Sequence, residues 1–254
     1  MVYAAERHEA ILERARAQGR VEVGALAESL GVTVETVRRD LTALERLGVV
    51  RRVHGGAIPV ERLTLEPSLA LRETQRSEQK LRVAQRAVAE VPEGGSILLD
   101  SGTTTLAMAG LLPLDKSITV VTNAFAIAAR LADSPGIELM ILGGRIRTRT
   151  GAAVGQWAID ELRDLHVDVA FLGANGFSVA RGFTTPDQAE SATKRAMVRA
   201  GRRVIVLADA SKAGQVHLNR FADTQEVAML VTDAALDDDM AEDFDNAGVE
   251  VVRT

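Results

Sequence analysis

The chain has 254 residues, no cysteine and a formal net charge of −5. This length allows one large domain, or a large domain with a small one, and the lack of cysteine excludes disulfides, thiolate catalysis and cysteine-based zinc sites. No apolar stretch is long enough to cross a membrane and the start lacks the apolar core of a signal peptide, so we expect a cytoplasmic protein without a membrane partner. The four histidines are not spaced as metal ligands, and we expect neither a metal nor a cofactor.

Charge is distributed unevenly along the chain. Residues 1–62 hold ten arginines and nine carboxylates, which leaves 20 basic and 26 acidic side chains for the remainder. A neutral-to-basic module attached to an acidic body permits DNA binding by the module alone. We expect one domain over residues 1–58, a linker over 59–74 and a second domain over 75–254.

The first 47 residues have the layout of a helix-turn-helix. Helical spacing of apolar residues covers 7–18, 25–30 and 33–47, and a glycine follows each of these segments. Thr33 is placed to cap the third helix. Two short helices joined by a glycine-containing turn are typical of DNA-binding modules.

The third helix is expected to have two different faces. At 100° per residue its apolar side chains fall on one side and pack against the first two helices; they are Val34, Val37, Leu41, Leu44 and Leu47. The opposite face carries Glu35, Arg39, Thr42 and Arg46, with Thr36 and Arg38 on its flanks. Such a face suits the major groove, although by itself it is also compatible with a merely solvated helix.

The next segment favours the DNA interpretation. Two β-prone runs meet at Gly55-Gly56, a dipeptide suited to a hairpin, so residues 49–58 read as a wing. Arg51 and Arg52 on this wing are expected to contact phosphates. The predicted DNA-binding residues are Thr33, Glu35, Thr36, Arg38, Arg39, Thr42, Arg51, Arg52 and His54.

The remaining chain alternates short β-rich runs with helices, after a helix expected at 75–91. Strands are predicted at 96–99, 118–121, 138–142, 167–172, 204–207, 227–231 and 249–252, and helices at 104–112, 124–132, 156–165, 186–200 and 239–247. This alternation favours a Rossmann-like α/β domain: a mostly parallel sheet covered on both faces, with ligands at the carboxyl ends of its strands.

Small and polar residues follow five of these strands in succession, at Asp100–Thr105, Asn123, Gly143, Asn175 and Asp209–Lys212. The amides of Ser101, Gly102, Thr103, Thr104 and Thr105 open a helix, where they and the hydroxyls suit a phosphate. The loop is neither a Walker motif nor a GxGxxG fingerprint. One such loop would be an ordinary turn, but five matching strand ends favour a phosphorylated ligand.

Single residues leave some alternatives open. Lys212 is either an anion ligand or a surface lysine. Glu190 and Lys194 lie four residues apart, which favours a plain ion pair within one helix. Trp157 and the six phenylalanines are expected in the core.

Several segments of the chain have a recognisable order: Arg7 with Ile11, Leu26-Ala27, Thr33–Leu41, Leu44-Glu45 with Gly48, and Arg52–Ala57. They closely resemble the DeoR family of bacterial transcription regulators, above all through Thr36-Val37-Arg38-Arg39-Asp40-Leu41 and His54-Gly55-Gly56-Ala57. The second half resembles the DeoR sensor domain, a fold similar to ribose-5-phosphate isomerases and acyl-CoA transferases. The resemblance implies that Asp100–Thr105, Asn123, Asn175, Glu190, Asp209 and Lys212 line an effector site.

Three function classes compete for these features. A sugar-phosphate isomerase needs a carboxylate base, and the isomerases carry Asp-Gly-Ala-Asp-Glu where this chain has Gly173-Ala174-Asn175-Gly176-Phe177. An amide is no such base, so we expect no catalytic residue and no enzyme. A protein that only organises DNA would not explain the pocket. We expect a repressor of a sugar-metabolism operon, a homodimer or homotetramer on double-stranded DNA, released by a phosphorylated sugar.

Overall fold

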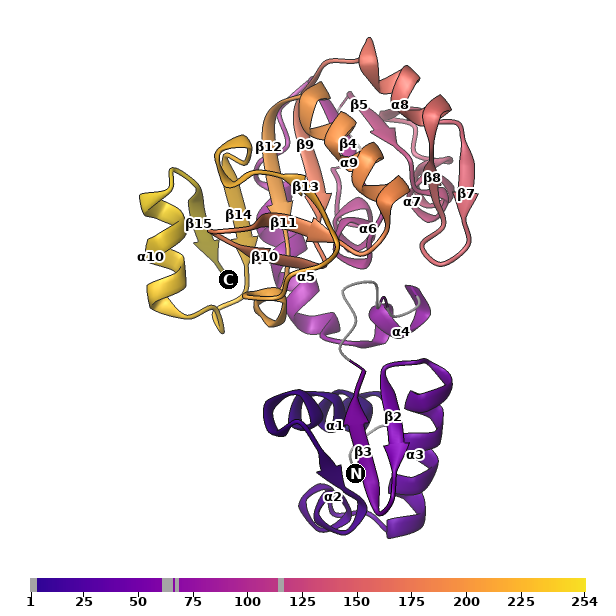
Figure 1. Cartoon of the computed structure of the whole chain (residues 1–254). Helices are drawn as coiled ribbons and strands as arrows, with labels where there is room; N and C mark the ends of the chain where they lie inside the picture. The colour runs from indigo at the N-terminus through magenta and orange to yellow at the C-terminus, as the bar shows by residue number, and fades with distance from the viewer. Residues whose placement is uncertain (1–3, 61–65, 67–68, 114–116) are drawn as a thin grey trace. The chain divides into compact units, whose positions relative to one another are not determined.

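The computed structural model describes residues 4–60, 66, 69–113 and 117–254, without the side chains of residues 16, 17, 70 and 71 (Figure 1). The chain divides into two compact units, Met1–Gln75 and Arg76–Thr254. Of the predicted linker, residues 61–65 and 67–68 lie outside the described part, and Leu69–Thr74 form a short helix, α4. No helix within the described ranges is long and apolar enough to cross a bilayer.

The first unit is a winged helix-turn-helix. Its elements in chain order are α1 (Ala4–Gln18), β1 (Val21–Glu22), α2 (Val23–Leu30), α3 (Val34–Arg46), β2 (Val50–Val53) and β3 (Gly56–Pro59). The strands form an antiparallel sheet in the order β1-β3-β2, and the β2–β3 hairpin is the predicted wing (Figure 1).

Local chemistry sets the ends of these elements. Thr33 caps α3 as predicted, because its Oγ1 accepts the backbone N–H of Thr36 at 3.1 Å. Gly55 turns the wing with a φ of 76°, a conformation that favours glycine. At Gly56 a Cβ atom would lie 1.9 Å from the carbonyl oxygen of Val21, so only glycine lets β3 approach β1.

The core of this unit forms on one face of α3. Val37, Leu41 and Leu44 are fully buried and pack with residues of α1 and α2, as predicted. Leu47 is partly buried against the same cluster. The prediction for Val34 is wrong: it is 40% exposed, because the core contacts begin one turn further along the helix that it opens.

A buried carboxylate fixes α3 against α1. Asp40 accepts two hydrogen bonds from the Arg7 guanidinium, from Nε at 2.9 Å and from Nη2 at 3.2 Å. His8 Nε2 lies 3.0 Å from the same carboxylate. A bidentate arginine–carboxylate pair fixes the relative orientation of the two side chains as well as their distance. The pair therefore sets how α3 is rotated about its axis.

The second unit contains the elements α5 (Ser77–Val88), β4 (Ser96–Leu99), α6 (Thr103–Ala109), β5 (Ile118–Thr122), α7 (Phe125–Leu131), β6 (Ile137–Ile141), β7 (Arg145–Arg147), β8 (Ala152–Val154), α8 (Gln156–Arg163), β9 (Val167–Gly173), β10 (Gly176–Ser178), β11 (Gly182–Thr185), α9 (Gln188–Ala200), β12 (Gly201–Leu207), β13 (Asn219–Ala222), β14 (Met229–Thr232), α10 (Asp238–Asn246) and β15 (Glu250–Arg253). Two short 3-10 turns lie at Ala210–Lys212 and Thr224–Glu226. Seven strands form a parallel sheet in the order β15-β14-β12-β9-β4-β5-β6.

Apolar cores cover both faces of this sheet, as predicted. Alternate residues of one strand face opposite cores: Ile97 and Leu99 of β4 pack with α5, α6 and α7, whereas Leu98 packs with α8, α9 and α10. The structure adds a β7–β8 hairpin and a small antiparallel sheet, β10-β11-β13, neither of which was predicted. Their strands span only three or four residues, too short for a clear alternation of apolar residues.

Two aromatic residues contradict the predicted core. Five of the six phenylalanines are fully buried, but Phe125 is 66% exposed and Trp157 is 73% exposed. Each lies in the first turn of a short helix whose buried face begins after it, at Ile127 in α7 and at Ala158 in α8.

The Arg7–Asp40 pair leads to a prediction on stability. Asp40→Ala removes the buried carboxylate that accepts two hydrogen bonds from Arg7, so we expect a loss of about 3 kcal/mol in the unfolding free energy of the first unit. Urea unfolding followed by circular dichroism measures it. Glu35→Ala, at an exposed carboxylate of the same helix, is the control and should cost less than about 0.5 kcal/mol. Equal effects of the two variants would contradict the structural role of Asp40.

Candidate functional site

The predicted DNA-contacting residues lie on the outside of the first unit. Every one of them is exposed or half-buried; Arg38, Arg39, Arg51, Arg52 and His54 are all exposed. A folded helix whose apolar side faces inward therefore presents these residues to a partner. Their roles at DNA stay predictions.

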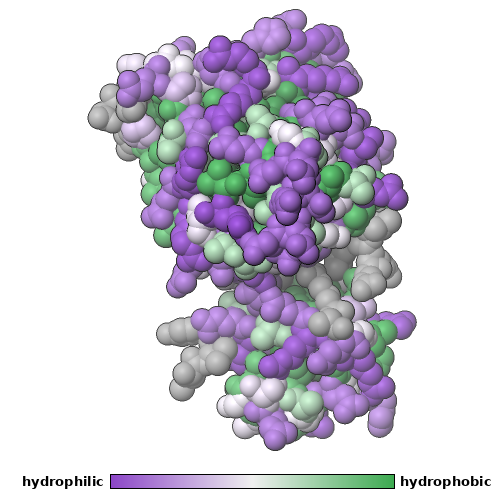
Figure 2. All heavy atoms as spheres, turned by 90° about the vertical axis from the view of Figure 1, so that its left-hand side faces the viewer, coloured by the Kyte–Doolittle hydropathy of each residue, from purple (hydrophilic) through white to green (hydrophobic). Residues whose placement is uncertain are grey.

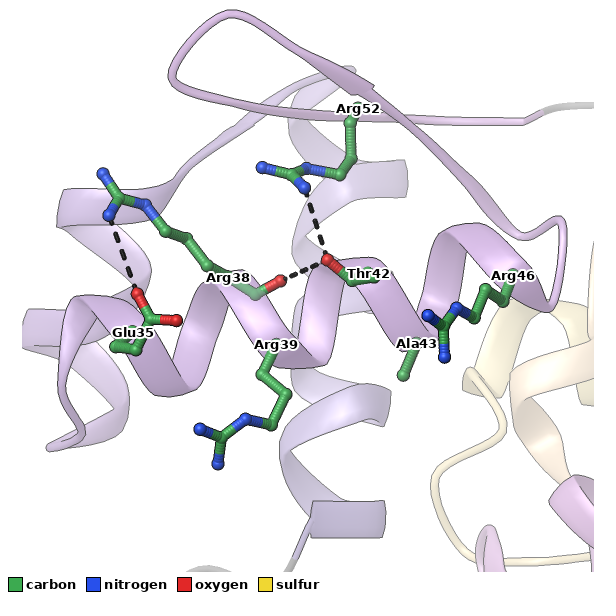
Figure 3. A pocket seen from close by; sticks show the side chains of 7 residues that line it. All are labelled: Glu35, Arg38, Arg39, Thr42, Ala43, Arg46 and Arg52. Atoms are coloured by element: carbon green, nitrogen blue, oxygen red, sulfur yellow. Dashed lines mark hydrogen bonds and ion pairs between the residues drawn. The ribbon is translucent and has the colours of Figure 1, made fainter.

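A hollow of about 430 Å³ lies between α3 and the wing (Figure 3). It is lined by Glu35, Arg38, Arg39, Thr42, Ala43, Arg46 and Arg52. Four guanidinium groups thus surround one concave surface with a single carboxylate, Glu35, which lies 3.7 Å from Arg38. This arrangement offers a strongly cationic surface to an anionic partner.

Two hydrogen bonds donated by Arg52 connect the wing strand β2 to α3. The backbone N–H of Arg52 donates to Glu45 Oε1 at 2.9 Å. The Arg52 side chain donates through Nη1 to Thr42 Oγ1 at 3.3 Å (Figure 3). Successive side chains of a strand point to opposite faces, so Arg51 is directed away from this contact. The sequence predicted a phosphate contact for each of the two arginines. The structure shows that they differ, because Arg52 is hydrogen-bonded to α3 whereas Arg51 points away from it.

In the second unit, the predicted effector residues lie at the carboxyl ends of neighbouring strands. Asp100 follows β4 and is fully buried. One of its oxygens, Oδ2, accepts hydrogen bonds from the ammonium group of Lys194 and from the backbone N–H of Gly173, the latter at 3.0 Å. The other oxygen, Oδ1, has no hydrogen-bond partner among the residues that the structure describes. Burial raises the pKa of Asp100, and Lys194 and the Gly173 amide act against that rise.

Two asparagines brace adjacent strand ends. Asn123, after β5, accepts the backbone N–H of Ser101 at 3.1 Å and donates to the carbonyl of Ala153 at 3.1 Å. Asn175, after β9, accepts the Thr185 hydroxyl at 3.0 Å. Both therefore hold loops at the site in place.

A cationic cluster surrounds the end of β12. The buried Asp209 lies 3.5 Å from Lys212 and 3.9 Å from Arg76. Burial opposes its ionisation, but Lys212, a hydrogen bond from Ser211, Lys80 and Arg76 together hold the pKa of Asp209 below its ordinary value. We name Arg76, Lys80, Asp209 and Lys212 the β12 cluster.

The predicted ion pair between Glu190 and Lys194 is wrong. Lys194 turns into the sheet toward Asp100, whereas Glu190 accepts Arg147 Nη1 at 3.2 Å and the Thr150 hydroxyl. Both side chains are buried, and an intrahelical pair is a feature of an exposed helix surface. The two residues instead attach α9 to the strand ends and to the β7–β8 hairpin.

The other predicted effector residues divide into two groups. Thr104 and Thr105 are buried and Gly102 and Thr103 half-buried beside the Asp100 network, with the Thr105 hydroxyl bonded to the carbonyl of Gly102 at 3.0 Å. Gly143 lies at the end of edge strand β6, next to the end of β5 that carries Asn123, and its N–H donates to Glu161 of α8 at 2.7 Å.

Sequence reasoning missed Arg76 and Lys80. Lys80 had a signal, because it lies three, four and seven residues before Val83, Ala84 and Ala87 on the buried stripe of α5. A lysine in an apolar stripe indicates a partner inside the protein. Arg76 had none: its left-handed φ of 51° emerges only from the fold.

The lowered pKa of Asp209 predicts a pH dependence. A carboxylate with a lowered folded-state pKa stabilises the fold fully above about pH 4, and this contribution is lost as the pH falls through the lowered value. Asp209→Asn should therefore cost about 2 kcal/mol at pH 7 and clearly less at pH 3. Urea unfolding at both values measures it, with the exposed Asp160→Asn as control. The same cost at both pH values would contradict the assignment.

Within the described residues, no group of three or more His, Cys, Asp or Glu side chains is placed to hold a metal ion.

Among solved structures, ribose 5-phosphate isomerase A from Methanocaldococcus jannaschii is similar over 55% of this chain and 55% of its own, with a TM-score of 0.41 and 21% identity, too slight a likeness to carry an argument.

Comparison with known families and curated proteins identifies the family. Residues 7–62 match the DeoR-like helix-turn-helix domain and residues 75–234 match the DeoR C terminal sensor domain. The chain is 38% identical to the HTH-type transcriptional regulator GlpR of Haloferax volcanii, over 98% of this chain and 97% of that protein. It is 34% identical to the putative aga operon transcriptional repressor of Escherichia coli O157:H7, over 97% and 93%. The chain therefore belongs to the DeoR family of transcriptional regulators.

Proposed function

We propose that this regulator represses a sugar-metabolism operon and leaves its operator when a phosphorylated sugar binds the second domain. The proposal has two parts, a DNA-reading surface made by α3 and the wing and an effector pocket at the strand ends. A ligand that binds better to the state with weak DNA affinity couples the two. A coupling of about 1–3 kcal/mol changes operator affinity roughly 5–150-fold.

The single observation that carries the DNA part is the hollow between α3 and β2 with its four guanidinium groups. Arginine donates two hydrogen bonds to guanine, whereas wing arginines contact phosphates without reading sequence. Arg39 stands on the exposed face of a helix whose rotation is fixed by Arg7 and Asp40. We assign base reading to Arg39 and phosphate contact to Arg51.

The effector part is supported by the chemistry of two adjacent sets of groups. The β12 cluster supplies cationic donors, which suit a phosphate. The Asp100 network supplies a buried carboxylate oxygen, Oδ1, that is ready to accept a hydroxyl. The strands that carry these two sets, β12 and β4, are separated by one strand, β9. Their ends therefore lie about 10 Å apart. A sugar with a terminal phosphate has groups of both kinds at about this separation.

A second candidate function is sugar-phosphate isomerisation by the same pocket. Asp100 favours it, because a buried carboxyl with a raised pKa is suited to proton transfer. Asn175 argues against isomerisation, because this chain has an amide at the position where the isomerases carry carboxylates. Relatives over the full length are named transcriptional regulators, so we retain the sensor as the proposal.

Two arginine variants test the DNA part. Arg39→Ala should weaken binding to the specific operator by about 1–3 kcal/mol, or roughly 5–150-fold, and change binding to random DNA little, because it removes a base contact. Arg51→Ala should weaken both and reduce the salt slope by about one. Titrations with both DNAs at several salt concentrations measure this, and thermal unfolding should stay unchanged because both side chains are exposed. Equal losses of Arg39→Ala on the two DNAs would reject base reading by this residue.

A ligand panel tests the effector part. Pentose and hexose phosphates are screened by thermal unfolding, with each free sugar as its matched control. We expect one phosphorylated sugar to raise the midpoint by preferential binding to the folded state and to release operator DNA. Lys212→Ala should abolish this response. A free sugar that works equally well would contradict the anion site, and turnover of any sugar phosphate would favour the isomerase.

A further inference from the structure

One carboxylate lies among the guanidinium groups of the hollow between α3 and the wing. Glu35 is exposed, and it is the one acidic side chain among the described residues that line this hollow with Arg38, Arg39, Arg46 and Arg52 (Figure 3). Duplex DNA carries one negative charge per about 1.7 Å of its axis. A carboxylate on a surface for DNA weakens the attraction to phosphates, so phosphate binding does not explain Glu35.

Two local interactions of Glu35 concern stability and not DNA. Its carboxylate lies 3.7 Å from Arg38 Nη1, but both side chains are more than half exposed, and such pairs contribute little to stability. An acidic residue in the first turn of a helix also interacts favourably with the helix dipole. This dipole effect is the competing explanation of Glu35, and it predicts no influence on the DNA sequence that is bound.

Other carboxylates of the chain have different surroundings. The part of the second unit that carries α10 is mostly hydrophilic (Figure 2). Five acidic side chains of this segment are exposed: Asp238, Asp239, Glu242, Asp243 and Asp245. They lie next to one another in the sequence of one helix, whereas Glu35 shares a concave surface with four arginines. Glu35 therefore belongs to the surface that we propose for DNA.

The four bases differ in what they offer a carboxylate. In the major groove guanine and thymine present acceptors, adenine presents an acceptor beside its amino group, and cytosine presents only the N4 amino donor. A carboxylate has acceptors alone, so cytosine is the base that matches it. Residues near the N-terminus of a recognition helix contact base edges, and Glu35 is the second residue of α3.

The neighbours of Glu35 on the hollow fit this role. The Thr42 hydroxyl donates to the carbonyl of Arg38 at 2.8 Å and accepts Arg52 Nη1 at 3.3 Å, so its proton is used within the protein. Glu35 and Arg39 are one helical turn apart, about 6 Å along the axis of α3. This rise corresponds to about two base-pair steps of 3.4 Å, so the two side chains reach different base pairs when α3 lies along the groove.

We propose that Glu35 is a specificity-determining residue that accepts a hydrogen bond from N4 of a cytosine in the major groove. The inference rests on the DNA part of the proposed function and deepens it, because it names the base. Arg39 contacts the guanine of a second G·C pair, about two steps away. Glu35 also repels phosphates and bases with acceptors at its position, and such repulsion of wrong partners increases specificity.

Selection from a pool of randomised duplexes tests the base preference. Wild-type protein should enrich two defined G·C pairs about two steps apart. Glu35→Gln should convert one of them to an A·T pair, because a glutamine amide pairs with N6 and N7 of adenine, and Arg39→Ala should lose the other. Glu28→Gln, at an exposed carboxylate of α2 outside the hollow, is the matched control and should select the wild-type sequence. A Glu35→Gln pool identical to the wild-type pool would overturn the assignment.

Affinity for two duplexes gives a second readout with opposite signs. Glu35→Ala removes a negative charge from the surface, so it should bind random duplex DNA about 2–5-fold more tightly at low salt. Its affinity for the duplex that the wild type selects should fall at least about 3-fold, because the cytosine contact is lost. Circular dichroism checks that the variant is folded. Changes of the same sign on both duplexes would reject the role of Glu35 in reading a base.

The wild-type selection separates this inference from the proposed function. A wild-type protein that enriches no sequence would reject both the DNA part of the proposed function and the role of Glu35. A wild-type protein that enriches a sequence which the Glu35 variants also select would reject the role of Glu35 alone.

Discussion

Parallel pairing of β12, β9, β4 and β5 is the constraint on which the second domain depends. Parallel strands all end at the same side of the sheet, so loops that are far apart in the sequence meet there. Asp100, Asn123, Asn175 and Asp209 come from four such loops. The intervening helices cover both faces of the sheet, which leaves the strand ends as the place where polar side chains collect.

Asp100 and Asp209 are both buried at strand ends, but their pKa values are shifted in opposite directions. Asp100 has one close cation, Lys194, and burial prevails, so its pKa is raised. Asp209 is also buried but interacts with Lys212, Lys80 and Arg76, and the positive charges prevail, so its pKa is lowered. In the effector site that we propose, the end at Asp209 therefore suits an anion and the end at Asp100 suits a hydroxyl. Such a difference would fix the direction in which a ligand binds, which a uniformly charged site would not.

The fold class and the strand ends were predictable from sequence because both follow from local patterns. β-rich runs of four to six residues marked each strand of the large sheet, and the cap at Thr33 is a local interaction. The partners of Lys194 and Glu190 were not predictable, since spacing within a helix says nothing of which buried group lies opposite. Trp157 was misassigned for a related reason: residue type favours burial, but only the fold shows that the buried face of α8 begins one residue later, at Ala158.

In the first domain, helix α3 carries both residues that stabilise the fold and residues that face outward. Asp40 and Arg39 are neighbours in sequence, yet one is buried against Arg7 and the other is exposed. An apolar pair in place of both Arg7 and Asp40 would stabilise the packing of the helix about as well as the buried ion pair does, because ions lose hydration on burial. It would not fix direction, whereas the two-pronged pair does. Reading a base requires a side chain to reach one base edge in one orientation. If Arg39 reads a base as we propose, the buried Arg7–Asp40 pair contributes to specificity by fixing the orientation of the helix that carries Arg39.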